Sequence, residues 1–325
     1  MIRAWNAVVW LILIVVALIS HDSAAQEAAA PEQEQLARLI RRLDSDRFED
    51  RERAARELLE IGLPAVEALQ AARSHPSAEV RWRARSLVDS LTANVRRREL
   101  ADFAGQPDDR LDLEHGMWLI ARILNPGVKQ AELSKQLDNL AHRVAKKLDK
   151  GELAASAEPE KAVAVIRQVL FVEVGFTGNT NERYHPDNSS LERVLQTKKG
   201  LPIVLSHLTI AVARRLDVPL VGVPLSGTYI VKYDASRAPV WAGKDDLFID
   251  PFENGRLLHA GDELERAFPG QDATNEAPLN NRETLERMLR NLASSLTDRK
   301  DGERLEQAEE FLQMLSAYAP DAGPE

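Results

Sequence analysis

"GLPIVLSHLTIAVARRLDVPLVGVPLSGTYIVKYD", residues 200–234, predicts a buried helix, a turn and two strands. Pro202 suits the first position of the helix, because a proline lacks the N–H that has no intrahelical partner there. Apolar residues follow it, and β-branched and aromatic residues recur in two short runs over residues 218–223 and 229–233. The helix is expected to pack on these strands through Val204, Leu205, Leu208, Val212 and Leu216. The stretch therefore predicts the centre of an α+β domain.

The overall composition is that of a globular protein. Of the 325 residues, 44% are hydrophobic and 29% are charged, which excludes a disordered chain and allows about two domains. The net charge of −9 argues against nucleic acid or an anionic membrane surface as the main partner. The chain has no cysteine, so it offers no disulfide, no thiol nucleophile and no cysteine for lipid attachment.

The N-terminus has the pattern of a targeting segment. Arg3 precedes an apolar run over residues 7–20, and Ser23 and Ala25 occupy the small-residue positions before Gln26. We expect a signal peptide over residues 1–25, a solvated linker over residues 26–35, and export to the periplasm or the outside of the cell. The alternative is a membrane anchor formed by residues 7–20, although this run is short for a membrane span.

An internal repeat follows the linker. "EDRERA" at residues 49–54 recurs as "EVRWRA" at residues 79–84, and the helical patterns over residues 36–98 resemble HEAT-type helical repeats. Residues 26–105 contain 14 arginines and no lysine against 15 acidic residues. A nucleic-acid surface would be unbalanced in charge, so we expect these arginines to pair with the acidic residues instead.

The second region extends over residues 100–275 and is followed by two helices within residues 280–318. Three helices are expected near residues 111–124, 133–148 and 160–174, and a short strand at residues 247–250. A 16-residue loop, residues 175–190, is rich in Gly, Asn, Asp and Pro. Loops of this length are uncommon inside a compact domain and are often functional.

Several motifs in this region resemble a bacterial SirB-type family of the transglutaminase-like superfamily. They are, in order, "DLEHGMWLIARILNP", "LDNLA", "GFTGNTNERYHPDNSSLERVLQTKKGLPIVLSHLTIAVARRL", "SGTYIVKY" and "LFIDPFENGRLL". The resemblance covers about residues 100–318, where the tail "RMLRNL" is similar to a TPR-like helical pair. It implies an α+β, papain-like fold with a small antiparallel sheet and many helices, preceded here by the helical repeats.

The resemblance also implies a Cys-His-Asp triad, and most of that triad is missing. The resemblance places the cysteine at the N-terminus of the helix, which starts here near Pro202, a residue that offers no nucleophile. SirB-type members usually have Gly-x-Pro-x-Ser-Leu at this helix start, and Val204 stands where that serine would be. Thr228 stands at the position of the strand histidine, and Asp250 alone is kept. An aspartate that orients a histidine has no role in catalysis without that histidine. We therefore expect a domain without the family's chemistry.

Other residues could in principle rebuild a site around Asp250, and the weak candidates are Thr228, His185 and His207, with Tyr184 beside His185. Ser206 and His207 are neighbours on one helix and cannot face each other, so His207 is expected to be a partly buried, hydrogen-bonded histidine. The residues expected to line the former cleft are Asn179, Tyr184, Asn188, Pro202, Thr228, Tyr229, Asp250 and Pro251. No metal-ligand spacing and no phosphate-binding loop is present, so neither a metal nor a cofactor is expected.

These observations favour an exported, non-catalytic transglutaminase-like protein. It would bind a protein or peptide through its altered cleft or through the surface of its helical repeats. Two alternatives stay open: a hydrolase or transamidase of peptide or amide bonds with a rebuilt site around Asp250, and a scaffold protein of the cell envelope.

The signal-peptide interpretation gives a first prediction. Because Ser23 and Ala25 satisfy the small-residue rule for cleavage, the exported chain should begin at Gln26. The intact mass of protein purified from the periplasm of an expressing bacterium measures this directly. A mass that includes residues 1–25 would contradict cleavage and favour the anchor.

Overall fold

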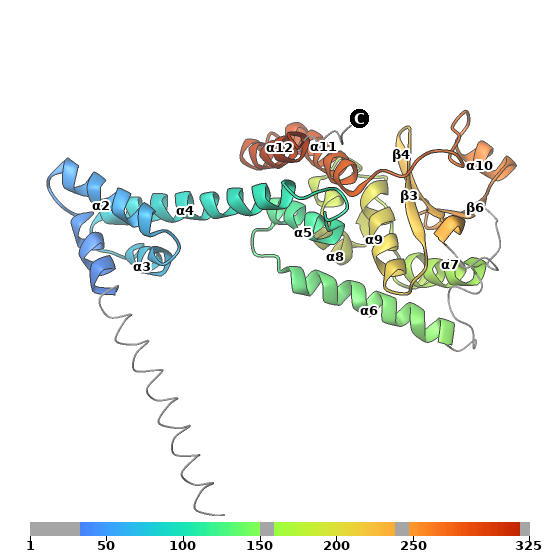
Figure 1. Ribbon diagram of the computed structural model, residues 1–325, viewed down its shortest axis with the longest axis horizontal. Coiled ribbons are helices and arrows are strands. Elements are labelled where there is room, and N and C mark those ends of the chain that lie inside the picture. Colours follow the sequence, from blue (N-terminus) through green and yellow to red (C-terminus); the bar gives the residue numbers. More distant parts are fainter. Residues whose placement is uncertain (1–32, 150–158, 238–246, 319–325) are drawn as a thin grey trace, which may run out of the picture. The chain divides into compact units, whose positions relative to one another are not determined.

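The computed structural model describes residues 33–149, 159–237 and 247–318, which divide into two compact units, Met1–Glu99 and Leu100–Glu325 (Figure 1). The division falls within the helix α4 (Ala78–Ala104). The expected signal peptide and residues 26–32 of the expected linker lie outside the described residues, whereas residues 33–35 are already helical.

The first unit is a set of helices around its own apolar core. Residues 33–42 are helical, and α2 (Phe48–Ile61), α3 (Ala65–Ala72) and the start of α4 follow. Apolar residues at helical spacing are buried here, namely Leu36, Leu39, Leu43, Ala54, Leu58, Leu69, Val80, Ala84, Leu87 and Leu91. The helical periodicity of this segment therefore identified most of its core.

The 30-residue sequence repeat is also a repeat of contacts. Arg51 Nη1 donates to the backbone carbonyls six and five residues before it, at 2.7 and 3.2 Å. Arg81 Nη1 makes the equivalent contacts, at 2.8 and 2.6 Å. Arg83 pairs with Glu79 at 2.6 Å and with Glu52 of the preceding repeat at 2.8 Å. These arginines thus close turns and pair with acids, whereas the HEAT-like interpretation stays a prediction.

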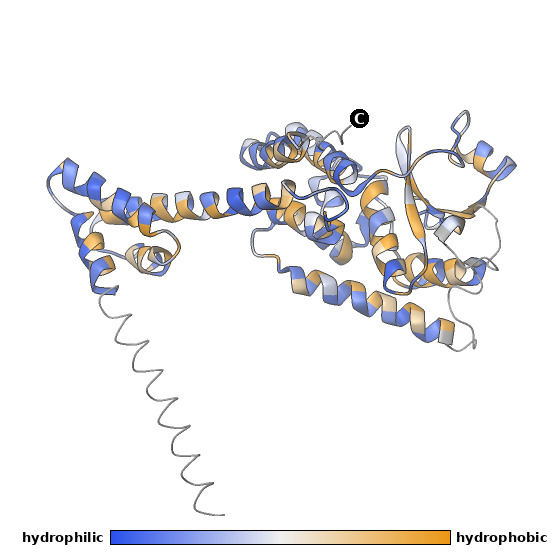
Figure 2. Ribbon diagram, in the orientation of Figure 1, coloured by the Kyte–Doolittle hydropathy of each residue, from blue (hydrophilic) through white to orange (hydrophobic). Residues whose placement is uncertain are grey.

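The second unit opens with long helices. They are α5 (Leu113–Leu124), α6 (Gln130–Asp149) and α7 (Pro159–Arg167), which continues as the π-helix η1 (Gln168–Glu173). Asp112 caps α5 by accepting a hydrogen bond from the backbone N–H of His115 at 2.6 Å. Hydrophobic and hydrophilic residues alternate along α6, as expected for a helix with one buried face (Figure 2).

The expected long loop is structured in part. Within it lie the short strand β1 (Thr177–Gly178) and the 3₁₀ helix η2 (Pro186–Ser189), and α8 (Leu191–Thr197) follows. β1 pairs in parallel with β2 (Lys199–Gly200), directly before α9 (Pro202–Arg214). This pairing fixes the start of the loop beside the start of α9.

Four antiparallel strands form the sheet, in the order β3 (Leu220–Leu225), β4 (Thr228–Tyr233), β5 (Leu247–Asp250) and β6 (Arg256–His259). Leu225 pairs with Thr228, so Ser226 and Gly227 form the β3–β4 turn. Gly227 adopts a φ of 76°, a conformation that costs glycine little. β3 lies at the edge of the sheet, where Pro224 can lack an N–H without breaking an interior ladder.

The helix α9 packs on β3 and β4 and is buried on nearly every side (Figure 1). Val204, Leu205, Leu208 and Val212 lie in the core as predicted. Leu216 is only half-buried, because the helix ends at Arg214 and the chain turns there toward β3. The α+β fold with a small antiparallel sheet and many helices, predicted from the sequence, is confirmed.

The chain then continues through α10 (Asp262–Ala267), α11 (Asn281–Arg299) and α12 (Gly302–Ser316). Arg282 is buried and donates to Asp108 at 2.6 Å and to the carbonyls of Ala104, Gln106 and Leu315. It therefore ties the start of α11 both to the end of α4 and to the end of α12. None of the helices in the described part of the chain has both the length and the hydropathy needed to cross a bilayer.

Candidate functional site

A pocket of about 200 Å³ opens at the N-terminal end of α9, and we call it the cleft pocket. The loop before η2, the start of α9, the β3–β4 turn and α11 surround it. Four of the eight residues expected to line the cleft do so: Tyr184, Pro202, Thr228 and Tyr229. The structure thus brings these four residues together from the loop before η2, from α9 and from β4.

Two arginines shape this pocket. Arg183 Nη2 donates to the carbonyl of Gly227 at 2.8 Å, and Arg287 Nη2 donates to the carbonyls of Leu225 and Thr228 at 3.1 and 2.9 Å. Each guanidinium has five N–H donors, so donors remain for a ligand after these contacts. The α9 N-terminus, which has no side-chain cap, adds its own positive end. The cleft pocket therefore favours carboxylate or carbonyl oxygens.

Asn179 and Asn188 do not line the cleft pocket but hold its loop. Asn179 Nδ2 donates to Asn188 Oδ1 at 3.0 Å, and Asn188 Nδ2 donates to the carbonyls of Glu182 and Arg183 at 2.6 and 3.1 Å. The backbone carbonyl of Asn188 accepts from the N–H of Leu201 at 3.0 Å. These two expected cleft residues therefore position Arg183 and Tyr184 beside the start of α9.

The three positions that correspond to the triad in the resemblance do not form a reacting group. Val204 is buried in the core, and its side chain carries no polar atom. Asp250 is 2% exposed, pairs with Arg256 Nη2 at 2.9 Å and accepts from the N–H of Glu253 at 3.3 Å. Thr228, a candidate for a rebuilt site around Asp250, is not among the described partners of that carboxylate. The remaining cleft candidate, Pro251, begins the β5–β6 turn next to Asp250.

His207 is buried and hydrogen-bonded, as expected for a structural histidine. Its Nε2 lies 3.2 Å from Tyr229 Oη, and the neighbouring Ser206 Oγ donates to the carbonyl of Tyr229 at 3.1 Å. Gly222 leaves room for this tyrosine, because a Cβ there would come within 2.4 Å of the ring. Burial lowers the pKa of His207 to about 3 and raises the pKa of Tyr229 to about 12. Both side chains are therefore neutral near pH 7.

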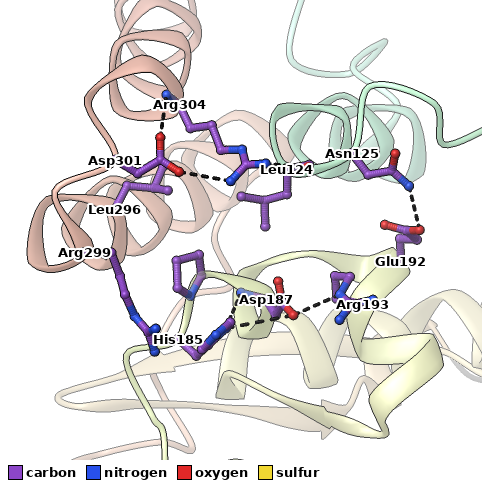
Figure 3. A pocket seen from close by; sticks show the side chains of 11 residues that line it. Leu124, Asn125, His185, Asp187, Glu192, Arg193, Leu296, Arg299, Asp301 and Arg304 are labelled. Carbon is purple, nitrogen blue, oxygen red and sulfur yellow. Dashed lines mark hydrogen bonds and ion pairs between the residues drawn. The ribbon is translucent and has the colours of Figure 1, made fainter.

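His185 lies in a second pocket, of about 390 Å³ (Figure 3). Its Nδ1 accepts a hydrogen bond from the backbone N–H of Asp187 at 3.2 Å. Neither His185 nor His207 is among the described partners of Asp250, so the candidates for a rebuilt site are divided among separate places. Within the described residues, no group of three His, Asp or Glu side chains is placed to hold a metal ion.

Several residues that line these pockets were not predicted from the sequence. Arg183 could have been found, because it stands next to Tyr184 in a loop already identified as functional. Arg287 carried no local signal, since it lies 59 residues from Thr228, whose carbonyl it contacts. Glu192 and Arg299 of the second pocket are likewise far apart in the chain and share no motif.

Comparison with known families agrees with this geometry. Residues 131–290, which include most of the residues that line the cleft pocket, match the family model described as the transglutaminase-like superfamily. The chain contains a transglutaminase-like domain. No solved structure matches it.

Similar proteins are found in bacteria and animals. The chain is 40% identical over 150 residues to a UPF0162 protein of Xylella fastidiosa (strain Temecula1), covering 43% of this chain and 51% of the relative. It is 32% identical over 149 residues to a UPF0162 protein of Pseudomonas aeruginosa, covering 46% and 49%. Identity to human F-box only protein 21 is 27% over 215 residues, covering 60% of this chain and 34% of that protein. The chain thus spans about half the length of its bacterial relatives, and the SirB-type name stays a resemblance.

Asp250 gives a prediction about stability. Replacement of this buried carboxylate by alanine should lower the free energy of unfolding by about 1–3 kcal/mol, because Arg256 and the N–H of Glu253 lose their acceptor. Urea denaturation measures the loss. Asp250→Asn, which keeps an acceptor oxygen, should lose less, and an unchanged unfolding energy in the alanine variant would contradict a structural role.

His207 gives a prediction about pH. Its folded pKa of about 3 lies below the ordinary value of 6.5, so the unfolded state binds the proton more strongly between these values. Stability should therefore fall as pH decreases below about 6.5, by up to about 1.4 kcal/mol per pH unit from this group. His207→Gln should make the decline shallower in urea denaturation between pH 4 and 7, on the order of that slope.

The control for this experiment is His142→Gln, since His142 is an exposed residue of α6. That variant should follow the wild-type curve. Parallel pH profiles for wild type and His207→Gln would show that the buried imidazole does not contribute to acid sensitivity.

Proposed function

We propose that this chain is an exported, non-catalytic transglutaminase-like protein that binds a segment of a protein or peptide in the cleft pocket. One observation carries the proposal: the cleft pocket is present, whereas the thiol and the imidazole needed to cleave a peptide bond are not in it. Val204 and Thr228 supply neither a thiol nor an imidazole, and Asp250 is engaged by Arg256. Acyl transfer through a covalent intermediate needs an activated nucleophile and a base.

The lining of the cleft pocket supports binding. Tyr184 is 66% exposed, so most of its side chain is accessible to a ligand. Tyrosine and arginine are the residue types most enriched among those that dominate binding energy at protein interfaces. Arg183 and Arg287 add donors for the carbonyl or carboxylate oxygens of an extended peptide. A volume of about 200 Å³ suits one or two side chains of such a segment and not a folded domain.

The helical-repeat segment offers a second surface for the same function. Trp82 is 63% exposed, and Phe48 and Leu63 are also exposed large apolar residues of this unit. Exposed apolar residues in a repeat segment are a common feature of partner-binding surfaces. The two surfaces lie in different units and can be tested separately.

A matched pair of aromatic truncations tests the proposal. Peptides selected from a phage-displayed random library on the protein lacking residues 1–25 should bind Tyr184→Ala about tenfold more weakly, because the ring anchors the segment. Trp82→Ala should leave binding unchanged. Fluorescence anisotropy with the selected peptides measures both affinities. Both side chains are exposed, so neither truncation removes core packing.

Two outcomes would contradict the proposal. Loss of binding in Trp82→Ala with none in Tyr184→Ala would move the site to the repeat surface. Turnover of peptide or ester substrates by the wild-type protein, abolished by Asp250→Asn in a folded variant, would favour the rebuilt-enzyme alternative.

A further inference from the structure

The second pocket is lined by groups of balanced charge. It lies among the C-terminal end of α5, η2, α8 and the turn between α11 and α12 (Figure 3). Three arginines and three carboxylates line it, together with His185. Most of these charges neutralise one another, since Arg193 pairs with Asp187 at 2.9 Å and Arg304 pairs with Asp301 at 3.0 Å. Two charged groups of opposite sign are left over.

The first is Glu192, a carboxylate that is only 8% exposed. Its Oε1 accepts hydrogen bonds from Asn125 Nδ2 and Gln196 Nε2, both at 2.9 Å. Its Oε2 is buried and has no hydrogen-bond partner in the described part of the chain. A buried carboxylate oxygen without a donor is destabilising, so a ligand that supplies an N–H or an ammonium group would be favoured here.

The second is Arg299 at the end of α11. No carboxylate pairs with it among the described residues, and its side chain extends toward His185 in Figure 3. His185 Nδ1 accepts the N–H of Asp187, so the neutral imidazole carries its proton on Nε2. Arg299 and His185 therefore present donors to an anionic group, on a part of the pocket different from Glu192.

We propose that the second pocket binds a small zwitterion, of the amino-acid or short-peptide class. Its ammonium group would meet Glu192 Oε2, and its carboxylate would meet Arg299 and the Nε2–H of His185. The pocket volume of about 390 Å³ is near the lower end of the range for small-molecule sites, roughly 300–1,000 Å³. A polyanion fits poorly, because Asp187, Glu192 and Asp301 would repel it and Glu192 Oε2 would stay without a donor. This site is separate from the cleft pocket and does not depend on the function proposed for it.

Calorimetric titration with three related probes tests the proposal. Alanyl-alanine with free ends should bind saturably, whereas its N-acetylated form and its C-terminal amide should each bind at least about tenfold more weakly. Each blocked probe removes one of the two charges that the pocket is expected to recognise. Inorganic phosphate should bind more weakly than the free dipeptide.

Two variants assign the ends of the ligand. Glu192→Gln keeps the size of the side chain and an oxygen for Asn125 but removes the charge. This variant should therefore bind the free dipeptide more weakly and bind the acetylated dipeptide with unchanged affinity. Arg299→Ala should bind the free dipeptide more weakly and bind the C-terminal amide with unchanged affinity. Arg290→Ala is the matched control, because Arg290 lies on the same helix, pairs with Glu286 and does not line the pocket. Tyr184→Ala, which tests the cleft pocket, should not change dipeptide binding.

Several results would overturn the proposal. The first is absence of saturable dipeptide binding to the wild-type protein up to concentrations on the order of 10 mM, in which case solvent fills the pocket. The second is equal affinity for the free and acetylated dipeptides, and the third is tighter binding of phosphate. If Glu192→Gln fails to fold, the exposed Arg299→Ala variant and the blocked probes on wild type still decide the question.

Discussion

The burial of α9 is the constraint on which the second unit depends. Every residue from Pro202 to Ile210 is buried, so this helix has no solvent-facing side over more than two turns. A helix that is apolar all round needs neighbours on each side, and β3, β4, α6 and α8 supply them. Its polar side chains must then find partners inside: Ser206 and His207 both bond to Tyr229, and Thr209 Oγ1 bonds to the carbonyl of Leu205 at 2.8 Å. The two bonds to Tyr229 fix the register of α9 against β4.

The same packing explains how the cleft can persist without the chemistry implied by the resemblance. Val204 fills a core position near the helix start, and Asp250 is held by Arg256 and a backbone N–H, so both positions serve stability. The shape of the cleft depends on other residues, because Arg183 and Arg287 bind the carbonyls of the β3–β4 turn. A cleft held by backbone contacts of this kind does not need a nucleophile to keep its form.

Sequence periodicity predicted the parts of the fold whose side chains alternate regularly between core and solvent. The helices expected near residues 111–124 and 133–148 correspond to α5 (Leu113–Leu124) and α6 (Gln130–Asp149). The helix expected over residues 160–174 changes to a π-helix at Gln168, where Val174 N–H bonds to the carbonyl of Val169. Residues 160–174 are apolar at most positions, so they have no clear periodic pattern in which a wider turn would appear as a shift.

The sites were predictable only where their residues share a local motif. Tyr184, Pro202, Thr228 and Tyr229 belong to short motifs whose order suggested a cleft, and all four line it. Arg287, Glu192 and Arg299 become site residues only when α11 packs beside η2 and α8, which no local pattern encodes. Long-range pairing of this kind depends on tertiary packing, and a single sequence gives little information about it.

The loop between β1 and α8 connects the two pockets. Tyr184 lines the cleft pocket, and the next residue, His185, lines the second pocket. The side-chain amide of Asn188 donates to the carbonyls of Glu182 and Arg183, and its backbone carbonyl accepts from the N–H of Leu201. One buried residue therefore fixes the backbone on which residues of both pockets lie. The unusual length of this loop is thereby explained: it carries side chains to two pockets while Asn188 anchors it to the buried α9. The two pockets thus share one loop, which a backbone hydrogen bond from Leu201 to Asn188 fastens to the start of the buried helix α9.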